Sequence, residues 1–220
     1  MTRRTVISAI EEHKAFAIIR GISADKIRPT LNALYEGGIR LVEVTFDRKG
    51  DAQNTIDALR ILASEYDKKL IFGAGTVTTV EQVKQVKELG GQFIVSPDFN
   101  PEVIKATRDN GLVSLPGVMT PTEALQAHDA GADFIKLFPG GLLGPAYLQA
   151  ICAPLSDLKF VAVGGVDSNN ISDFAKAGAI GFGIGSNLVN NKLVENDQFD
   201  EIQQNALKYK QAIEQLKVRN

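Results

Sequence analysis

The chain has 220 residues, of which 44% are hydrophobic and 23% charged, a composition typical of a globular domain. Its formal net charge of -2 provides no basic field for nucleic acid or a membrane surface. With one cysteine and two histidines, the sequence excludes an intramolecular disulfide and a His/Cys metal cluster. No apolar run approaches the roughly 20 residues of a membrane span. The first residues are too charged for a secretory signal, so we expect a cytoplasmic protein.

Eight short apolar runs recur along the chain, and each is followed by a segment with helical periodicity. The predicted strands are residues 16–19, 41–46, 70–73, 93–95, 112–115, 134–138, 160–163 and 180–184. They lack long alternation of polar and apolar residues, which is typical of parallel strands that are covered on both faces.

The segments between these runs carry helix start and stop signals. The predicted helices are residues 26–36, 51–66, 80–89, 101–111, 121–131, a stretch that begins near 145, 168–178 and 199–216. Pro101 stands in the favoured first position after Asn100, for example, and Gly111 ends that helix.

Eight strand–helix units without a linker predict a closed (β/α)8 TIM barrel that forms a single domain over residues 1–220. An extra N-terminal helix, residues 5–14, precedes the barrel of residues 15–220, and we expect it to cover the barrel bottom. The alternative, an open doubly wound sheet, lacks support because no Gly-x-Gly-x-x-Gly fingerprint follows the first strand, which reads Ile19-Arg20-Gly21-Ile22.

A lysine lies in the middle of the sixth predicted strand, residues 134–138. Burying an ammonium group is costly, so Lys136 must find a partner or lose its proton. A neutral amine in a dry site is a nucleophile towards carbonyl groups. The alternative is a lysine whose stem lies in the strand while its charge reaches solvent.

The second predicted strand aims a carboxylate at the same place. In Leu41–Phe46 the pleat puts Glu43 and Thr45 on one face, with the valines on the helix-covered outside. The same alternation turns Lys136 and Phe138 inward. Glu43 and Lys136 then form a buried structural ion pair, or a nucleophilic amine with a nearby proton shuttle.

Glycines follow the last two predicted strands. Gly164-Gly165 and Gly185-Ser186 precede helical turns, and barrels often bind phosphate at these two loops. Turn formation alone would explain either glycine pair. Their occurrence in both loops favours phosphate binding.

Six motifs, spread in order over residues 16–186, together resemble the 2-keto-3-deoxy-6-phosphogluconate (KDPG) and 4-hydroxy-2-oxoglutarate (KHG) aldolases, which are class I, Schiff-base lyases on a (β/α)8 barrel. The matching stretches are Val42-Glu43-Val44-Thr45, Gly73-Ala74-Gly75-Thr76-Val77, Val95-Ser96-Pro97, residues 116–123 (PGVMTPTE), Ile135-Lys136-Leu137-Phe138-Pro139 and Gly164-Gly165-Val166.

The resemblance implies roles for matching residues. Lys136 would form the Schiff base with pyruvate, and Glu43 would move protons through a water molecule. Thr76 would hold the pyruvyl carboxylate, while Pro97 and Phe138 would wall the pocket.

One departure concerns the substrate carboxylate. Several family members carry an arginine two residues after the threonine of the second strand, where this chain has Asp47 followed by Arg48. Either the loop turns Arg48 inward, or Arg20 alone, which resembles the family's first-strand arginine, supplies the positive charge.

The resemblance also implies the substrate and assembly. Gly164, Gly165 and Ser186 would cradle a substrate phosphate, and the products would be pyruvate and glyceraldehyde 3-phosphate. Leu137-Phe138-Pro139-Gly140 resembles the branch that also cleaves 4-hydroxy-2-oxoglutarate. No metal or organic cofactor is required, and the family suggests a homotrimer. The rival readings are a sugar-phosphate epimerase or isomerase, and a barrel that binds a phosphorylated ligand without turnover.

Overall fold

The structure is a computed structural model that describes residues 1–48, 50 and 52–218. In this part of the chain, nine parallel strand segments form one sheet in the order β5-β4-β3-β2-β1-β9-β8-β7-β6. The strands are β1 (Ala15–Ile19), β2 (Leu41–Thr45), β3 (Ile71–Gly75), β4 (Phe93–Val95), β5 (Val113–Leu115), β6 (Gly117–Val118), β7 (Ile135–Leu137), β8 (Phe160–Val163) and β9 (Gly181–Ile184).

The segments β5 and β6 are two halves of one barrel strand. Pro116 lies between them and has no amide hydrogen to donate to a sheet ladder. β5 pairs with β4, β6 pairs with β7, and the amide of Lys136 donates to the carbonyl of Pro116 at 2.9 Å. The predicted (β/α)8 barrel is therefore confirmed, with one correction: the fifth strand does not end at Leu115 but continues to Val118.

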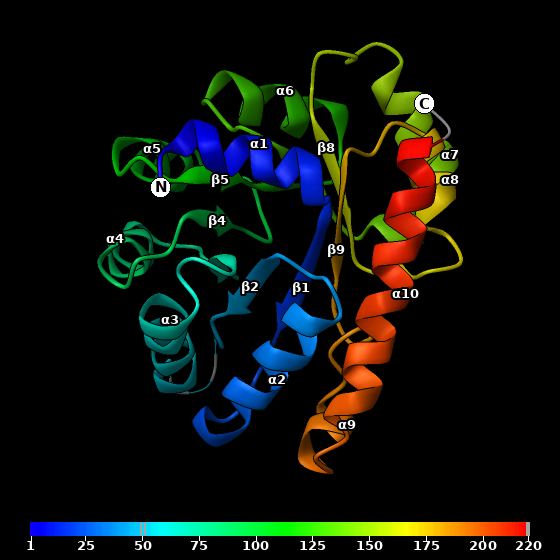
Figure 1. Ribbon diagram of the computed structural model, residues 1–220. Coiled ribbons are helices and arrows are strands. Elements are labelled where there is room, and N and C mark those ends of the chain that lie inside the picture. Colours follow the sequence, from blue (N-terminus) through cyan, green and yellow to red (C-terminus); the bar gives the residue numbers. More distant parts are fainter. Residues whose placement is uncertain (49, 51, 219–220) are drawn as a thin grey trace.

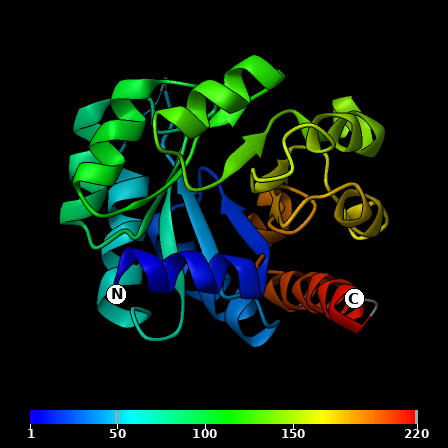
Figure 2. The ribbon, with the colours of Figure 1, turned by 90° about the horizontal axis from the view of Figure 1, so that it is seen from above.

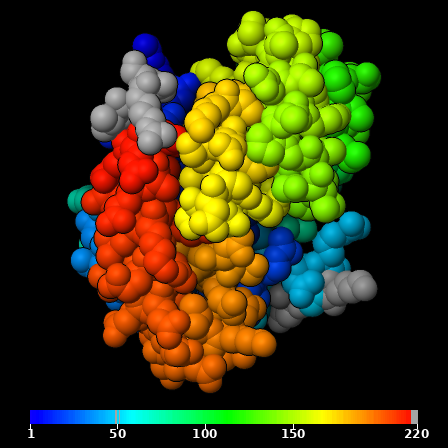
Figure 3. Space-filling view, turned by 90° about the vertical axis from the view of Figure 1, so that its right-hand side faces the viewer, coloured from blue at the N-terminus to red at the C-terminus, as the bar shows by residue number. Residues whose placement is uncertain are grey.

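Helices alternate with the strands and form the outer ring. Their bounds are α1 (Arg3–His13), α2 (Ala24–Glu36), α3 (Gln53–Glu65), α4 (Val80–Glu88), α5 (Pro101–Asp109), α6 (Pro121–Asp129), α7 (Gly140–Cys152), α8 (Ile171–Lys176), α9 (Asn191–Glu195) and α10 (Phe199–Val218). Figure 3 shows α10 in red beside α8 and α7 on one face of the molecule.

Local capping explains several of the helix boundaries. Thr79 and Thr120 each accept a hydrogen bond from a backbone amide three residues later, in complete capping boxes that begin α4 and α6. Asn100 caps α5, and Pro101 follows in the first position as expected. α7 contains a break at Gly144, so its second part begins at Pro145, close to the predicted start. The predicted start of the second barrel helix, Asp51, lies outside the described residues.

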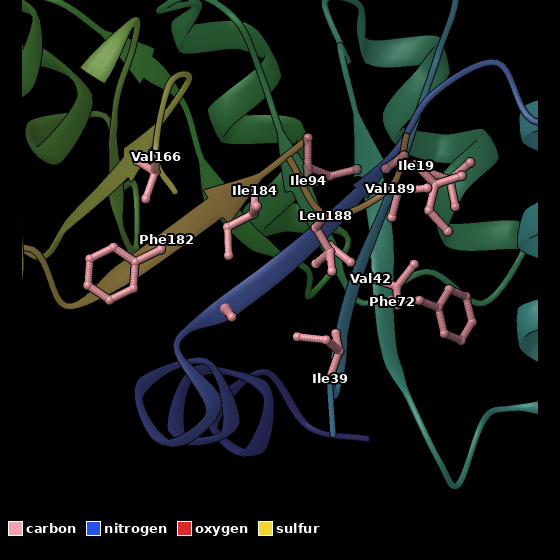
Figure 4. Packing of buried hydrophobic residues seen from close by; sticks show 14 of the residues in the cluster. Ile19, Ile39, Val42, Phe72, Ile94, Val166, Phe182, Ile184, Leu188 and Val189 are labelled. Carbon is pink, nitrogen blue, oxygen red and sulfur yellow. The ribbon is translucent and has the colours of Figure 1, made fainter. Parts of the chain in front are cut away.

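The strands separate two apolar layers. Outward-facing side chains such as Val42, Phe72 and Ile184 pack under the helices, and Figure 4 shows part of this layer. Inward-facing side chains, including Leu41 and Phe134, fill the barrel. The pleat predicted for the second and sixth strands is thus confirmed by the residues on either side of Glu43 and Lys136.

The N-terminal helix α1 covers one end of the barrel, as predicted. Figures 1 and 2 show it lying across the sheet, and in Figure 1 it is at the end opposite α9. Val6 and Ile10 of α1 pack against interior residues at the beginnings of the strands, such as Phe16. Arg3 also forms an ion pair with the buried carboxylate of Asp133. The opposite end, where the strands finish, is left free for a site.

Among the described residues, no helix combines the length and the apolar character that crossing a bilayer requires.

Candidate active site

A cavity of about 530 Å³ opens at the carboxyl ends of the strands. It brings together every residue that the sequence analysis assigned to the site except Thr45. These residues are Arg20, Glu43, Thr76, Pro97, Lys136, Phe138, Gly164, Gly165, Gly185 and Ser186. Because they come from seven different strand ends or the loops that follow them, the barrel fold is what assembles the site.

Lys136 lies in the middle of β7 and is only 6% exposed. Burial lowers the pKa of its ammonium group, and the nearby positive charge of Arg20 acts in the same direction, whereas Glu43 and Asp98 oppose the shift. Its Nζ atom lies 4.9 Å from the centre of the Phe138 ring. A lysine that reaches out to solvent is therefore excluded, and a neutral, nucleophilic amine becomes accessible at lower pH than for an exposed lysine.

Glu43 lies in the middle of β2 and is 3% exposed. Burial raises the pKa of its carboxyl group, and the charges of Lys136 and Arg20 only partly oppose that shift. Glu43 and Lys136 form no ion pair in the described part of the chain. Burial is the main cause of both pKa shifts, and a buried carboxyl group with a raised pKa beside a cavity is suited to a role in proton transfer.

The end of β3 contributes a residue in an unusual backbone conformation. Thr76 has φ +57°, in the left-handed region that residues other than glycine seldom adopt. Such conformations cluster at functional sites, where the surrounding structure holds them in place. Thr76 therefore lines the cavity from a fixed position at the end of β3.

Two adjoining glycines shape the wall after β8. Gly164 and Gly165 have φ +86° and +80°. A Cβ atom on Gly164 would approach the Phe138 ring at 3.1 Å, and one on Gly165 would lie 3.0 Å from the Cα of Gly141. The absence of side chains lets the backbone of this loop border the cavity directly, as an anion-binding loop requires.

Thr45 takes a different position from the one predicted. It is buried, but its Oγ donates to the carbonyl of Ile19 at 3.3 Å and it does not line the large cavity. It borders a smaller neighbouring cavity of about 130 Å³, together with Asp47. Arg48 does not line the large cavity, whereas Arg20 does. Of the two arginines considered for the substrate carboxylate, only Arg20 therefore borders this cavity.

The polar residues that follow β9 were not predicted from the sequence. Asn187, Asn190, Asn191 and Lys192 all line the cavity. They lie beyond the Gly185-Ser186 turn, in a stretch without a recognisable motif. A charged residue following a glycine turn in the last barrel loop was the only available signal. Elsewhere in the described ranges, no group of three or more His, Cys, Asp and Glu is arranged to hold a metal ion.

A barrel with a buried lysine and a buried glutamate at the carboxyl ends of its strands, below a glycine-lined loop, defines the class of Schiff-base aldolases. The chain belongs to the KDPG and KHG aldolase family, because the family's model matches residues 6–205.

Individual relatives agree with that assignment. A Rhizobium meliloti (strain 1021) protein, described as a probable 2-dehydro-3-deoxy-6-phosphogalactonate aldolase, is 38% identical over 178 residues, which are 80% of this chain and 82% of the relative. A solved structure described as native KDPGal is 34% identical, with a TM-score of 0.82 over 92% of this chain and 95% of the other.

A second solved structure bears on the chemistry. KDPG aldolase from Legionella pneumophila, described with pyruvate captured as a covalent carbinolamine intermediate, is 26% identical to this chain. The TM-score is 0.83, and the match covers 94% of this chain and 97% of the other. The predicted family, its lyase activity and its Schiff-base chemistry are thereby confirmed.

Proposed function

We propose that the protein cleaves a 6-phosphorylated 2-keto-3-deoxy sugar acid to pyruvate and glyceraldehyde 3-phosphate, with Lys136 as the nucleophile and Glu43 as the proton shuttle. The observation that carries the proposal is the placement of both groups, buried and desolvated, at the wall of one cavity. We also propose that the protein is located in the cytoplasm, as expected from the sequence.

The first half of the reaction forms the imine. Neutral Lys136 attacks the C2 carbonyl through Nζ and gives a carbinolamine. Glu43, in its protonated form, donates a proton to the leaving hydroxyl, so that water departs and a positively charged imine remains. Burial raises the pKa of Glu43, and this shift favours the protonated form that the step requires.

The second half breaks the carbon–carbon bond. The imine accepts the electron pair of the C3–C4 bond as the C4 hydroxyl loses its proton, and glyceraldehyde 3-phosphate leaves. The resulting enamine is protonated at C3, and hydrolysis of the imine releases pyruvate and regenerates Lys136. Arg20 holds the C1 carboxylate together with Thr76, and Gly164, Gly165, Gly185 and Ser186 surround the phosphate.

The configuration at C4 distinguishes two candidate substrates. The family resemblance implied the gluconate form, KDPG, and the family's name covers both KDPG and KHG. The Rhizobium meliloti relative and the native KDPGal structure favour the galactonate form, its C4 epimer. Cleavage of the two epimers and of 4-hydroxy-2-oxoglutarate, measured side by side as pyruvate released, determines the preference.

Borohydride reduction in the presence of pyruvate tests the mechanism. We expect a stable adduct on Lys136, located by mass spectrometry, together with loss of activity. A sugar-phosphate epimerase or isomerase, or a barrel that only binds its ligand, would give no such adduct. Lys136→Arg should abolish cleavage because a guanidinium group stays charged. Substantial cleavage by that variant would contradict the mechanism.

We further propose a homotrimer. The family resemblance supports it, as do the exposed apolar side chains of Met119 and Leu142. Light scattering of the purified protein tests the assembly, and a mass of one chain at micromolar concentration would contradict it.

A further inference from the structure

The cavity carries a positively charged residue for which the proposed chemistry provides no role. Its described lining contains three basic residues, Arg20, Lys136 and Lys192, and one acidic residue, Glu43. Lys136 must be neutral to attack the substrate. A phosphorylated keto acid, however, carries one carboxylate and one phosphate group, the latter close to two negative charges at pH 7.

We propose that Lys192 binds the phosphate group of the substrate and thereby gives the enzyme its preference for phosphorylated over unphosphorylated sugar acids. The inference rests on the proposed function and deepens it. It adds a charged side chain to a phosphate region that otherwise consists of glycine backbone and Ser186.

The position of Lys192 follows from its neighbours in the chain. Lys192 is the second residue of α9, the short helix that follows the Gly185-Ser186 turn. Its own amide donates to Oδ1 of Asn190 at 2.9 Å, and Nδ2 of the adjacent Asn191 donates to the carbonyl of Arg20 at 3.2 Å. The bond to Arg20 joins the first turn of α9 to the end of β1, and Figure 1 shows α9 at the end of the barrel opposite α1.

The two other basic residues of the cavity, Arg20 and Lys192, suit different groups of the substrate. Arg20 directly follows β1 and is close enough to Lys136 and Glu43 for its charge to affect both groups. It therefore lies near the reacting carbons and suits the carboxylate at C1. Lys192 is not among the charges that shift the pKa of either group, and it borders the same cavity from the last loop.

Lys192 is also available for a ligand. It forms no ion pair with any described residue, although Glu195 lies only one turn further along α9. The nearby acid Asp197 is instead paired with Lys26, at 2.5 Å. An exposed ammonium group at a cavity mouth keeps its hydration until an anion arrives, and its flexible stem then lets it follow the phosphate as a point charge.

The test compares two aldehydes that differ only in the phosphate. Condensation of pyruvate with D-glyceraldehyde 3-phosphate and with D-glyceraldehyde is measured for the wild type, Lys192→Gln and Lys192→Arg. Loss of a charge-assisted contact should raise the KM for the phosphorylated aldehyde by about 10- to 100-fold in Lys192→Gln. The rate with D-glyceraldehyde should stay within about twofold, and Lys192→Arg should keep most of the phosphate preference.

A matched control and a second readout guard against a merely structural effect. Lys84→Gln removes an exposed lysine of α4 that does not line the cavity, and it should alter neither reaction. Binding of inorganic phosphate, followed by 31P NMR, should weaken in Lys192→Gln and persist in Lys84→Gln. An equal loss with both aldehydes, no loss with either, or undiminished phosphate binding in Lys192→Gln would each overturn the proposal.

Failure of the proposed function would show in a different measurement. The pyruvate adduct on Lys136 depends on the Schiff-base chemistry and not on the phosphate. A wild type that forms no adduct therefore contradicts the aldolase mechanism, while phosphate binding still decides the role of Lys192.

Discussion

The carboxylate of Glu43 occupies space that only a glycine at position 75 leaves open. A Cβ atom built on Gly75 would overlap the Glu43 carboxyl group, which reaches Gly75 from the neighbouring strand β2. The glycine before Thr76 therefore has a packing role within the site. It leaves room for the Glu43 carboxyl group beside the neighbouring strand.

Gly75→Ala should displace that carboxylate and slow the proton transfers. We expect kcat to fall roughly 100-fold, the lower range for loss of a general acid–base group, and to approach the value of Glu43→Gln. Steady-state kinetics of both variants measure this fall in kcat. Gly111→Ala is the control, since a Cβ there meets nothing within 4 Å; it should lower stability through its φ of +70° but leave kcat per folded molecule unchanged. Full activity of Gly75→Ala would mean that the carboxylate position is unimportant.

The buried lysine should cost stability in a pH-dependent way. Burial lowers the pKa of Lys136 in the folded state below its ordinary 10.5. The unfolded chain therefore binds more protons between the folded pKa and 10.5, and stability rises with pH across that window. In the Glu43→Gln background, which removes the coupled carboxylate, adding Lys136→Met should stabilise the fold most at low pH.

This gain should shrink as the pH approaches 10.5. Urea unfolding at a series of pH values follows it. A gain that does not change with pH would show that Lys136 has an ordinary pKa in the folded protein.

For single residues, the sequence alone predicted the side-chain directions that the strand pleat determines and the site positions that the motifs determine. Alternation along a strand is enough to turn Glu43 and Lys136 inward. It did not place Thr45, because at the strand's end a hydrogen bond to the Ile19 carbonyl decides where the hydroxyl points. The sequence also did not single out Lys192, which reaches the cavity from a loop whose path no local pattern determines.

Among the secondary-structure elements, the split fifth strand has an end that the local sequence did not predict. The apolar run of residues 112–115 predicted a strand that ends at Leu115. Barrel closure instead continues the strand past Pro116, whose carbonyl still accepts a bond from β7. The helices were easier, since Asn100, Thr79 and Thr120 are local caps that act without tertiary structure.

The capping box of α6 offers a measurable contribution. Oγ of Thr120 accepts from the amide of Glu123, and Oε2 of Glu123 accepts from the amides of Met119 and Thr120, both at 2.8 Å. Thr120→Ala should lower the free energy of unfolding by about 1 kcal/mol. Thr79→Ala, in the equivalent box of α4, provides the comparison. A loss below the error of urea unfolding in both variants would contradict the capping assignment.

For the whole molecule, stability and chemistry lie at opposite ends of the barrel. Ile10 of α1 is fully buried against the interior cluster at the barrel bottom. Ile10→Ala should lower the free energy of unfolding by about 2–5 kcal/mol through the cavity that it leaves. Because the site lies at the other end, kcat per folded molecule should not change. A parallel drop in kcat would show that the two ends are coupled.

The order of the strands also divides the reaction between two halves of the polypeptide. Glu43 and Arg20 precede α5, whereas Lys136 and the glycine loops follow it, and β1 and β9 are neighbours in the sheet. Neither half alone contains both the amine and its proton shuttle. Two fragments, divided at the turn after α5 between Asn110 and Gly111, should therefore each be inactive alone. Pyruvate should form only when the fragments reassemble, so enzyme activity would report their association.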